Sequence, residues 1–138
     1  MPSGKNAARQ REEVLALVAD RMRPRERVVA VLPFAQTGKR PKPPKKVRDG
    51  IYQSYRRYRP LVVTDRRLFV LDTARTPHPR TVLAEFPLEG VTIVDVVPGS
   101  FGQQRVLLDL PGLGPVPFDL GRYDLDGLTS LRELMDQG

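Results

Sequence analysis

The chain has no cysteine, and its 138 residues include one histidine, His78. Without cysteine, disulfide bonds and thiolate metal sites are excluded. No apolar run approaches the roughly 18 residues of a membrane-spanning helix. No apolar core follows the basic N-terminal residues, as it would in a signal peptide. These absences favour one cytoplasmic domain, for which 40% hydrophobic and 28% charged residues are ordinary.

Catalytic and cofactor motifs are also absent. The sequence has no Gly-x-Ser-x-Gly, no phosphate-binding loop and no Gly-x-Gly-x-x-Gly. His78 stands between two prolines, where a structural turn residue is the simplest interpretation. Asp124-x-Asp126-Gly127 superficially matches the start of a calcium loop but lacks the downstream ligands. An acid capping a helix explains it better. We therefore expect no enzymatic activity, no cofactor and no metal.

Positive charge is concentrated in one segment. The chain carries +7 at pH 7, and residues 39–59 alone hold nine basic side chains against Asp49, a net +8. Four of the five lysines lie between residues 39 and 46, whereas the rest of the chain prefers arginine. Lysine is the more strongly hydrated cation. We therefore interpret residues 36–50 as a solvated basic loop, which its three prolines stiffen.

A β-hairpin is expected at residues 61–71. Leu61–Val63 and Leu68–Leu71 are apolar runs that suit a pleated, half-buried surface, and Thr64-Asp65-Arg66-Arg67 between them supplies the turn. Residues 51–58 fit either a helical turn or part of a strand. Five further runs have the length of strands and are separated by proline and glycine: residues 28–32, 81–86, 91–97, 105–110 and 116–120. Seven strands at this spacing predict an antiparallel sandwich or small barrel.

Two amphipathic segments flank the strands. Apolar residues recur at helical spacing between Asn6 and Met22, and Pro24 ends this pattern. We expect this helix to pack on its own domain, with docking to a partner protein as the alternative. The second helix begins near Asp124 or Asp126 and should close one end of the barrel. Its apolar stripe consists of Leu125, Leu128, Leu131, Leu134 and Met135.

The order of these elements, with the stretches LVVTDRRLFVL and FPLEGVTIVDV, resembles bacterial pleckstrin-homology-like (PH-like) and GRAM-like domains. The resemblance covers roughly residues 26–136. It implies a mainly β fold with α: a seven-stranded antiparallel PH-like barrel or sandwich, capped by a C-terminal helix and preceded by an N-terminal helix. The expected division is a helical extension at residues 1–24 and a PH-like domain at 25–138. The family implies a non-enzymatic domain that binds lipid head groups, peptides or proteins.

Lipid-binding members of the family carry a lysine, a spacer and a basic-x-Arg-x-apolar-apolar run. Lys46 or Lys45, followed by Arg57-Tyr58-Arg59-Pro60-Leu61-Val62, is similar, although Pro60 removes a ladder donor beside Arg59. Our hypothesis is that Lys45, Lys46, Arg57 and Arg59 contact phosphate, with longer-range attraction from Lys39, Arg40 and Lys42.

Four interpretations of the basic segment stay open. It is a solvated loop without a ligand, or a site for an anionic membrane surface at the inner face of the membrane. It is alternatively part of an adaptor whose partner protein binds the N-terminal helix. Nucleic acid is a less favoured partner, suggested by three tyrosines that alternate with arginines: Tyr52, Tyr55 and Tyr58.

Overall fold

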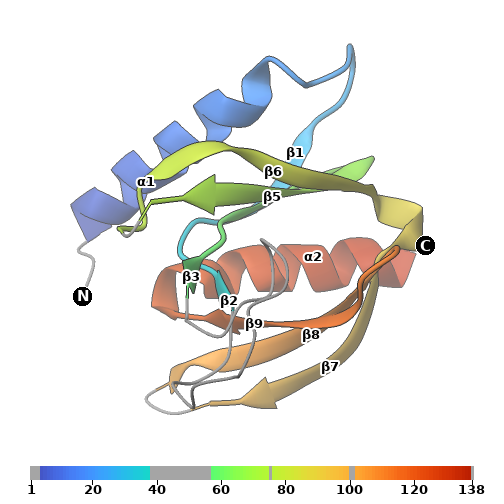
Figure 1. Cartoon of the computed structure of the whole chain (residues 1–138). Helices are drawn as coiled ribbons and strands as arrows, with labels where there is room; N and C mark the ends of the chain where they lie inside the picture. Colours follow the sequence, from blue (N-terminus) through green and yellow to red (C-terminus); the bar gives the residue numbers. More distant parts are fainter. Residues whose placement is uncertain (1–3, 38–56, 75, 100–101, 138) are drawn as a thin grey trace.

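Two antiparallel β-sheets and two helices make up the structure, a computed structural model that describes residues 4–37, 57–74, 76–99 and 102–137 (Figure 1). The four-stranded sheet has the order β1-β4-β5-β6 and the five-stranded sheet the order β3-β2-β9-β8-β7. The described strands thus form two separately hydrogen-bonded sheets and not a closed barrel. The expectation of a mainly β fold with helices is confirmed.

The four-stranded sheet contains β1 (Val28–Leu32), β4 (Leu61–Thr64), β5 (Arg67–Thr73) and β6 (Pro79–Pro87). The predicted hairpin is confirmed, because β4 and β5 pair antiparallel with Val63 opposite Leu68. Its turn is tighter than predicted, since Thr64 and Arg67 belong to the strands. The Thr64 hydroxyl accepts hydrogen bonds from the backbone N–H groups of Arg66 and Arg67, which closes the turn.

The five-stranded sheet contains β2 (Gln36–Thr37), β3 (Arg57–Tyr58), β7 (Thr92–Pro98), β8 (Gln104–Leu110) and β9 (Gly114–Leu120). All seven predicted strands are present. The two additional strands, β2 and β3, have two residues each, and β2 corrects the expectation that Gln36 begins a loop. A short 3-10 turn, η1 (Leu88–Gly90), leads from β6 at the edge of one sheet to β7 at the edge of the other.

The main core lies between the sheets and includes α2 (Leu125–Gln137), which follows the 3-10 turn η3 (Arg122–Asp124). In Figure 1, α2 lies between the four-stranded sheet and strands β7–β9. Leu128 and Leu131 are buried, and the other apolar residues of the predicted stripe are half-buried. Gly127 brings α2 against β1, because a Cβ atom at this position would lie 2.4 Å from the Val31 carbonyl oxygen.

A second core lies on the outer face of the four-stranded sheet, which α1 (Gly4–Ala19) covers. Val14 and Val18 of α1 pack there with Val62 and Phe69. The buried side-chain amide of Gln10 donates hydrogen bonds to the carbonyls of Pro33 and Pro77. The N-terminal helix therefore packs on its own domain, as expected. Neither described helix is long and apolar enough to cross a membrane.

Candidate functional site

The residues on either side of 38–56, the range that holds most of the basic segment, are paired with each other. Gln36 pairs with Tyr58 and Thr37 with Arg57, so β2 and β3 hold together the two ends of residues 38–56. The Thr37 hydroxyl donates a 2.8 Å hydrogen bond to the carbonyl of Pro117 in β9, which fixes this attachment point to the sheet. Five predicted anion contacts lie outside the described residues: Lys39, Arg40, Lys42, Lys45 and Lys46.

The two described members of the predicted site differ in exposure. Arg57 is exposed on β3. Arg59 is 2% exposed, and its Nη1 lies 3.2 Å from Oδ1 of Asp72 and donates to the carbonyl of Tyr58. Burial lowers the pKa of Arg59, and the negative charge of Asp72 opposes this shift. The buried guanidinium of Arg59 is thus paired with the half-buried carboxylate of Asp72, and the structure does not bring Arg59 to the surface with Arg57.

Tyr58 is the one tyrosine of the predicted stacking set within the described residues. Its half-buried ring packs edge-on against Phe34, with 6.3 Å between ring centroids and 71° between ring planes. The ring is therefore held in the domain by an aromatic contact of ordinary geometry. Tyr52 and Tyr55 lie outside the described residues.

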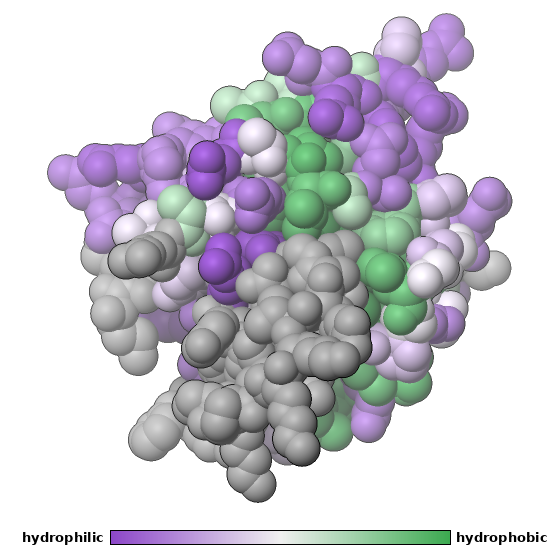
Figure 2. Space-filling model, in the orientation of Figure 1, coloured by the Kyte–Doolittle hydropathy of each residue, from purple (hydrophilic) through white to green (hydrophobic). Residues whose placement is uncertain are grey.

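A second group of cationic side chains lies in the loop between α1 and β1, residues 20–27, which we call the arginine loop. Its sequence places an arginine at every second position: Arg21, Arg23, Arg25 and Arg27. All four are exposed, and Figure 2 shows hydrophilic side chains gathered over this loop, at the upper right. Arg25 adopts a φ of 70°, a left-handed conformation that is uncommon for a residue other than glycine.

Glu26 points inward from the arginine loop and holds it to the hairpin. Its carboxylate accepts hydrogen bonds from the Arg23 N–H, the Thr64 hydroxyl, and Nε and Nη2 of Arg67. The Arg67 hydrogen bonds, helped by those from Arg23 and Thr64, lower the pKa of Glu26 from 4.5 to about 2, although burial acts in the opposite direction. Glu26 is therefore a buried carboxylate that stays ionised at neutral pH.

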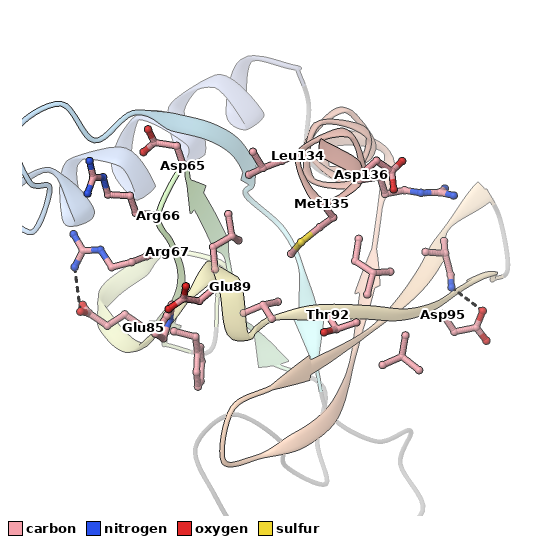
Figure 3. A pocket seen from close by; sticks show the side chains of 18 of the residues that line it. Asp65, Arg66, Arg67, Glu85, Glu89, Thr92, Asp95, Leu134, Met135 and Asp136 are labelled. Carbon is pink, nitrogen blue, oxygen red and sulfur yellow. Dashed lines mark hydrogen bonds and ion pairs between the residues drawn. The ribbon is translucent and has the colours of Figure 1, made fainter. Parts of the chain in front are cut away.

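A groove of about 1360 Å³ extends from the hairpin and the arginine loop toward the end of α2, between α2 and β7 (Figure 3). Its apolar lining includes buried Phe86 and half-buried Leu88, Ile93 and Met135. Charged side chains of both signs complete the lining: Arg23, Asp65, Arg66, Arg67 and Glu85 toward the hairpin, Glu89 on η1, and Asp95, Arg132 and Asp136 on β7 and α2. An apolar centre between charged ends can take up apolar side chains of another molecule.

Neither the arginine loop nor the groove was predicted from the sequence. The alternating arginines are visible in the sequence of this loop. The acids Asp20 and Glu26 lower its net charge, however, so the loop does not stand out when charges are summed along the chain. The groove depends on how far apart β6 and β7 lie, which a pattern of apolar residues does not report. No protein-family model matches the chain, and no curated protein matches it significantly.

His78 and Asp124, which the sequence offers as a possible catalytic residue and a possible metal ligand, both contact other parts of the fold. Nδ1 of the exposed His78 lies 2.9 Å from Oε1 of Glu13 on α1. Buried Asp124 accepts hydrogen bonds from the backbone N–H groups of Phe34 and Gly121, and so ties the start of the last helix to the turn after β1. Within the described parts of the chain, no group of three or more acidic or histidine side chains could hold a metal ion.

Proposed function

We propose that the chain is a non-enzymatic binding module with a PH-like domain, residues 25–138, that attaches reversibly to an anionic membrane surface through its basic segment. The observation that carries the proposal is the pairing of β2 with β3. Because the two ends of residues 38–56 meet there, the seven basic side chains between them and the exposed Arg57 are attached to the fold at one edge of the five-stranded sheet. A single anionic surface would attract these charges together.

Two features of the fold support the family part of this proposal. Seven predicted strands occur in two antiparallel sheets, and an amphipathic helix follows the last strand and packs into the core between them. Both are what the resemblance to PH-like domains implies. The exposed Arg57 belongs to the proposed contact set, whereas Arg59 serves as a buried structural residue.

The strength of attachment follows from the charges. Each Lys or Arg near an anionic leaflet contributes about 1 kcal/mol. Five or six such contacts would give roughly 5–6 kcal/mol, between millimolar and micromolar affinity. Attachment is therefore weak and sensitive to salt. The packing of Tyr58 on Phe34 favours this lipid ligand over single-stranded nucleic acid, which would need free rings for stacking.

Sedimentation with lipid vesicles tests the proposal. The protein should pellet with vesicles of phosphatidylserine and phosphatidylcholine but not with phosphatidylcholine alone. Replacing four contacts, Lys42→Ala/Lys45→Ala/Lys46→Ala/Arg57→Ala, should weaken binding about 10³-fold. The control removes the same charge from exposed positions elsewhere: Arg9→Ala/Arg11→Ala/Arg80→Ala/Arg122→Ala. Equal loss in both variants would mean that only net charge matters, and unchanged binding in the first would reject the segment.

A further inference from the structure

A pocket of about 320 Å³ lies at the edge of the four-stranded sheet, where α1 and α2 meet strand β1. The two helices lie on opposite sides of this sheet (Figure 1). Small residues from all three elements line the pocket: Ala7 and Ala8 on α1, Ala30 on β1, and Gly127 on α2. We call it the β1-edge pocket. Its volume falls at the lower end of the range for small-molecule sites.

Hydrogen bonds and ring packing hold the walls of this pocket in place. The buried amide of Gln10 ties α1 to the carbonyl of Pro33, at 3.0 Å. The carboxylate of Asp124 accepts a 2.8 Å hydrogen bond from the N–H of Phe34, and so ties the start of α2 to the same turn. The Tyr123 ring, which lines the pocket, packs against Phe34 with 6.3 Å between centroids. Such a preformed site loses little conformational entropy when a ligand binds.

The described lining of the pocket contains two charged side chains, which have opposite signs and come from opposite walls. Arg11 belongs to α1 and Asp126 to the first turn of α2, and both are exposed. Among the described residues, neither side chain takes part in an ion pair or a hydrogen bond. Arg122 lies outside the lining, 5.4 Å from the centroid of the Tyr123 ring. The pocket therefore offers one partner for a carboxylate and one for an ammonium group.

The shape of the site restricts its occupant. Among the described strands β1 pairs with β4 alone, but its register shifts between Val28 and Ala30. The backbone of α2 also lies against the Val31 carbonyl, because a Cβ atom on Gly127 would be 2.4 Å from that oxygen. Bulges and covered edges disfavour addition of a partner strand. An inserted Lys or Glu side chain would leave one of the two charges without a partner. A small molecule that carries both charges is what remains.

We propose that the β1-edge pocket binds a small zwitterion, an amino acid or a short peptide with free termini, with its carboxylate on Arg11 and its ammonium group on Asp126. The guanidinium suits this role because it binds carboxylates in a planar, two-pronged geometry. Both protein charges are exposed to water, so each ion pair raises the affinity by about fivefold at most. The pocket lies outside the basic segment and does not depend on lipid binding.

NMR titrations of the full chain test the proposal, with L-alanine, dialanine and trialanine as probes. The distance between the two charges increases along this series, so the probe that binds best distinguishes a free amino acid from a peptide. Binding should produce saturable shifts of the backbone amide signals of Ala8, Val29 and Gly127, which belong to the lining. N-acetylation and C-terminal amidation of the best probe each remove one charge, and each should weaken binding about fivefold.

Substitutions assign the two charges. Arg11→Gln should weaken binding of the best probe about fivefold and remove its advantage over the C-terminal amide. Asp126→Asn should likewise remove its advantage over the N-acetylated form. Arg9→Gln and Asp20→Asn make the same changes at exposed positions outside the pocket and should leave the affinity unchanged. Ala8→Leu fills the pocket from an exposed helix position, so it should abolish binding while the chain stays folded.

The outcomes separate this proposal from membrane attachment. The four-residue variant of the basic segment should bind the probe as the wild type does, even if it no longer binds vesicles. The zwitterion site is overturned if no probe gives saturable shifts at the pocket, or if blocked probes bind as well as free ones. Equal weakening by the control substitutions, or saturable shifts confined to the basic segment, would also overturn it.

Discussion

The substitution Glu26→Gln addresses the interaction that shapes the arginine loop. It keeps the size of the side chain and removes its charge, so Arg67 faces an amide in place of a carboxylate. Glu26 has a side chain with no exposed area, and Arg67 is 11% exposed. Removing one partner of such a buried pair leaves the other charge without compensation, which is strongly destabilising.

The magnitude follows from the titration of Glu26. Lowering its pKa from 4.5 to about 2 corresponds to about 3 kcal/mol of stabilisation at neutral pH. We therefore expect Glu26→Gln to lower the free energy of unfolding by about 3 kcal/mol in urea titrations at pH 7. Glu85→Gln is the matched control, because Glu85 also binds Arg67, at 3.1 Å, but is 38% exposed. That change should cost less than about 1 kcal/mol.

The pH dependence provides the sharper test. Because folding lowers the pKa of Glu26, its contribution is complete above about pH 4.5 and disappears as the pH falls toward about 2. The difference in stability between the wild type and Glu26→Gln should therefore shrink over this range. A difference that stays constant from pH 7 to pH 2.5, or a Glu85→Gln effect of equal size, would refute the assigned role of Glu26.

Two further changes test how α2 is attached. Gly127→Ala places a Cβ atom 2.4 Å from the carbonyl oxygen of Val31 and should destabilise the fold by about 3 kcal/mol in urea, whereas Gly4→Ala, which meets no atom within 4 Å, should be nearly neutral. Burial raises the pKa of Asp124 from 3.8 to about 6, so its contribution to stability is complete below pH 3.8 and is lost as the pH rises through 6. On lowering the pH from 7 to 4.5, the wild type should therefore gain about 2 kcal/mol more stability than Asp124→Asn does, measured by urea unfolding.

Longer apolar runs predicted the strands, but the sequence did not settle the two shortest: β2 lies where a loop was expected, and β3 lies in residues 51–58, which fit either a helical turn or part of a strand. A two-residue strand such as β2 or β3 contains no period from which it could be predicted. These two strands nevertheless hold the ends of the basic segment. The candidate site therefore depends on the part of the fold that is least visible in the sequence.

The expectation of a half-buried hairpin was wrong for a related reason. Leu61–Val63 and Leu68–Leu71 are buried throughout, because α1 covers the face opposite the main core. Uninterrupted apolar runs are typical of strands covered on both sides. The uninterrupted runs therefore indicate burial on both faces of the hairpin, with the amphipathic N-terminal helix as the cover of the second face.

The position of Arg59 could not be derived from its neighbours. Residues 59 and 60 connect β3 in one sheet to β4 in the other, so the chain changes sheets there. Strand alternation, which would place Arg57 and Arg59 on the same face, does not continue through such a crossing. The Arg59 side chain is therefore buried and paired with the half-buried Asp72, whereas Arg57 stays exposed.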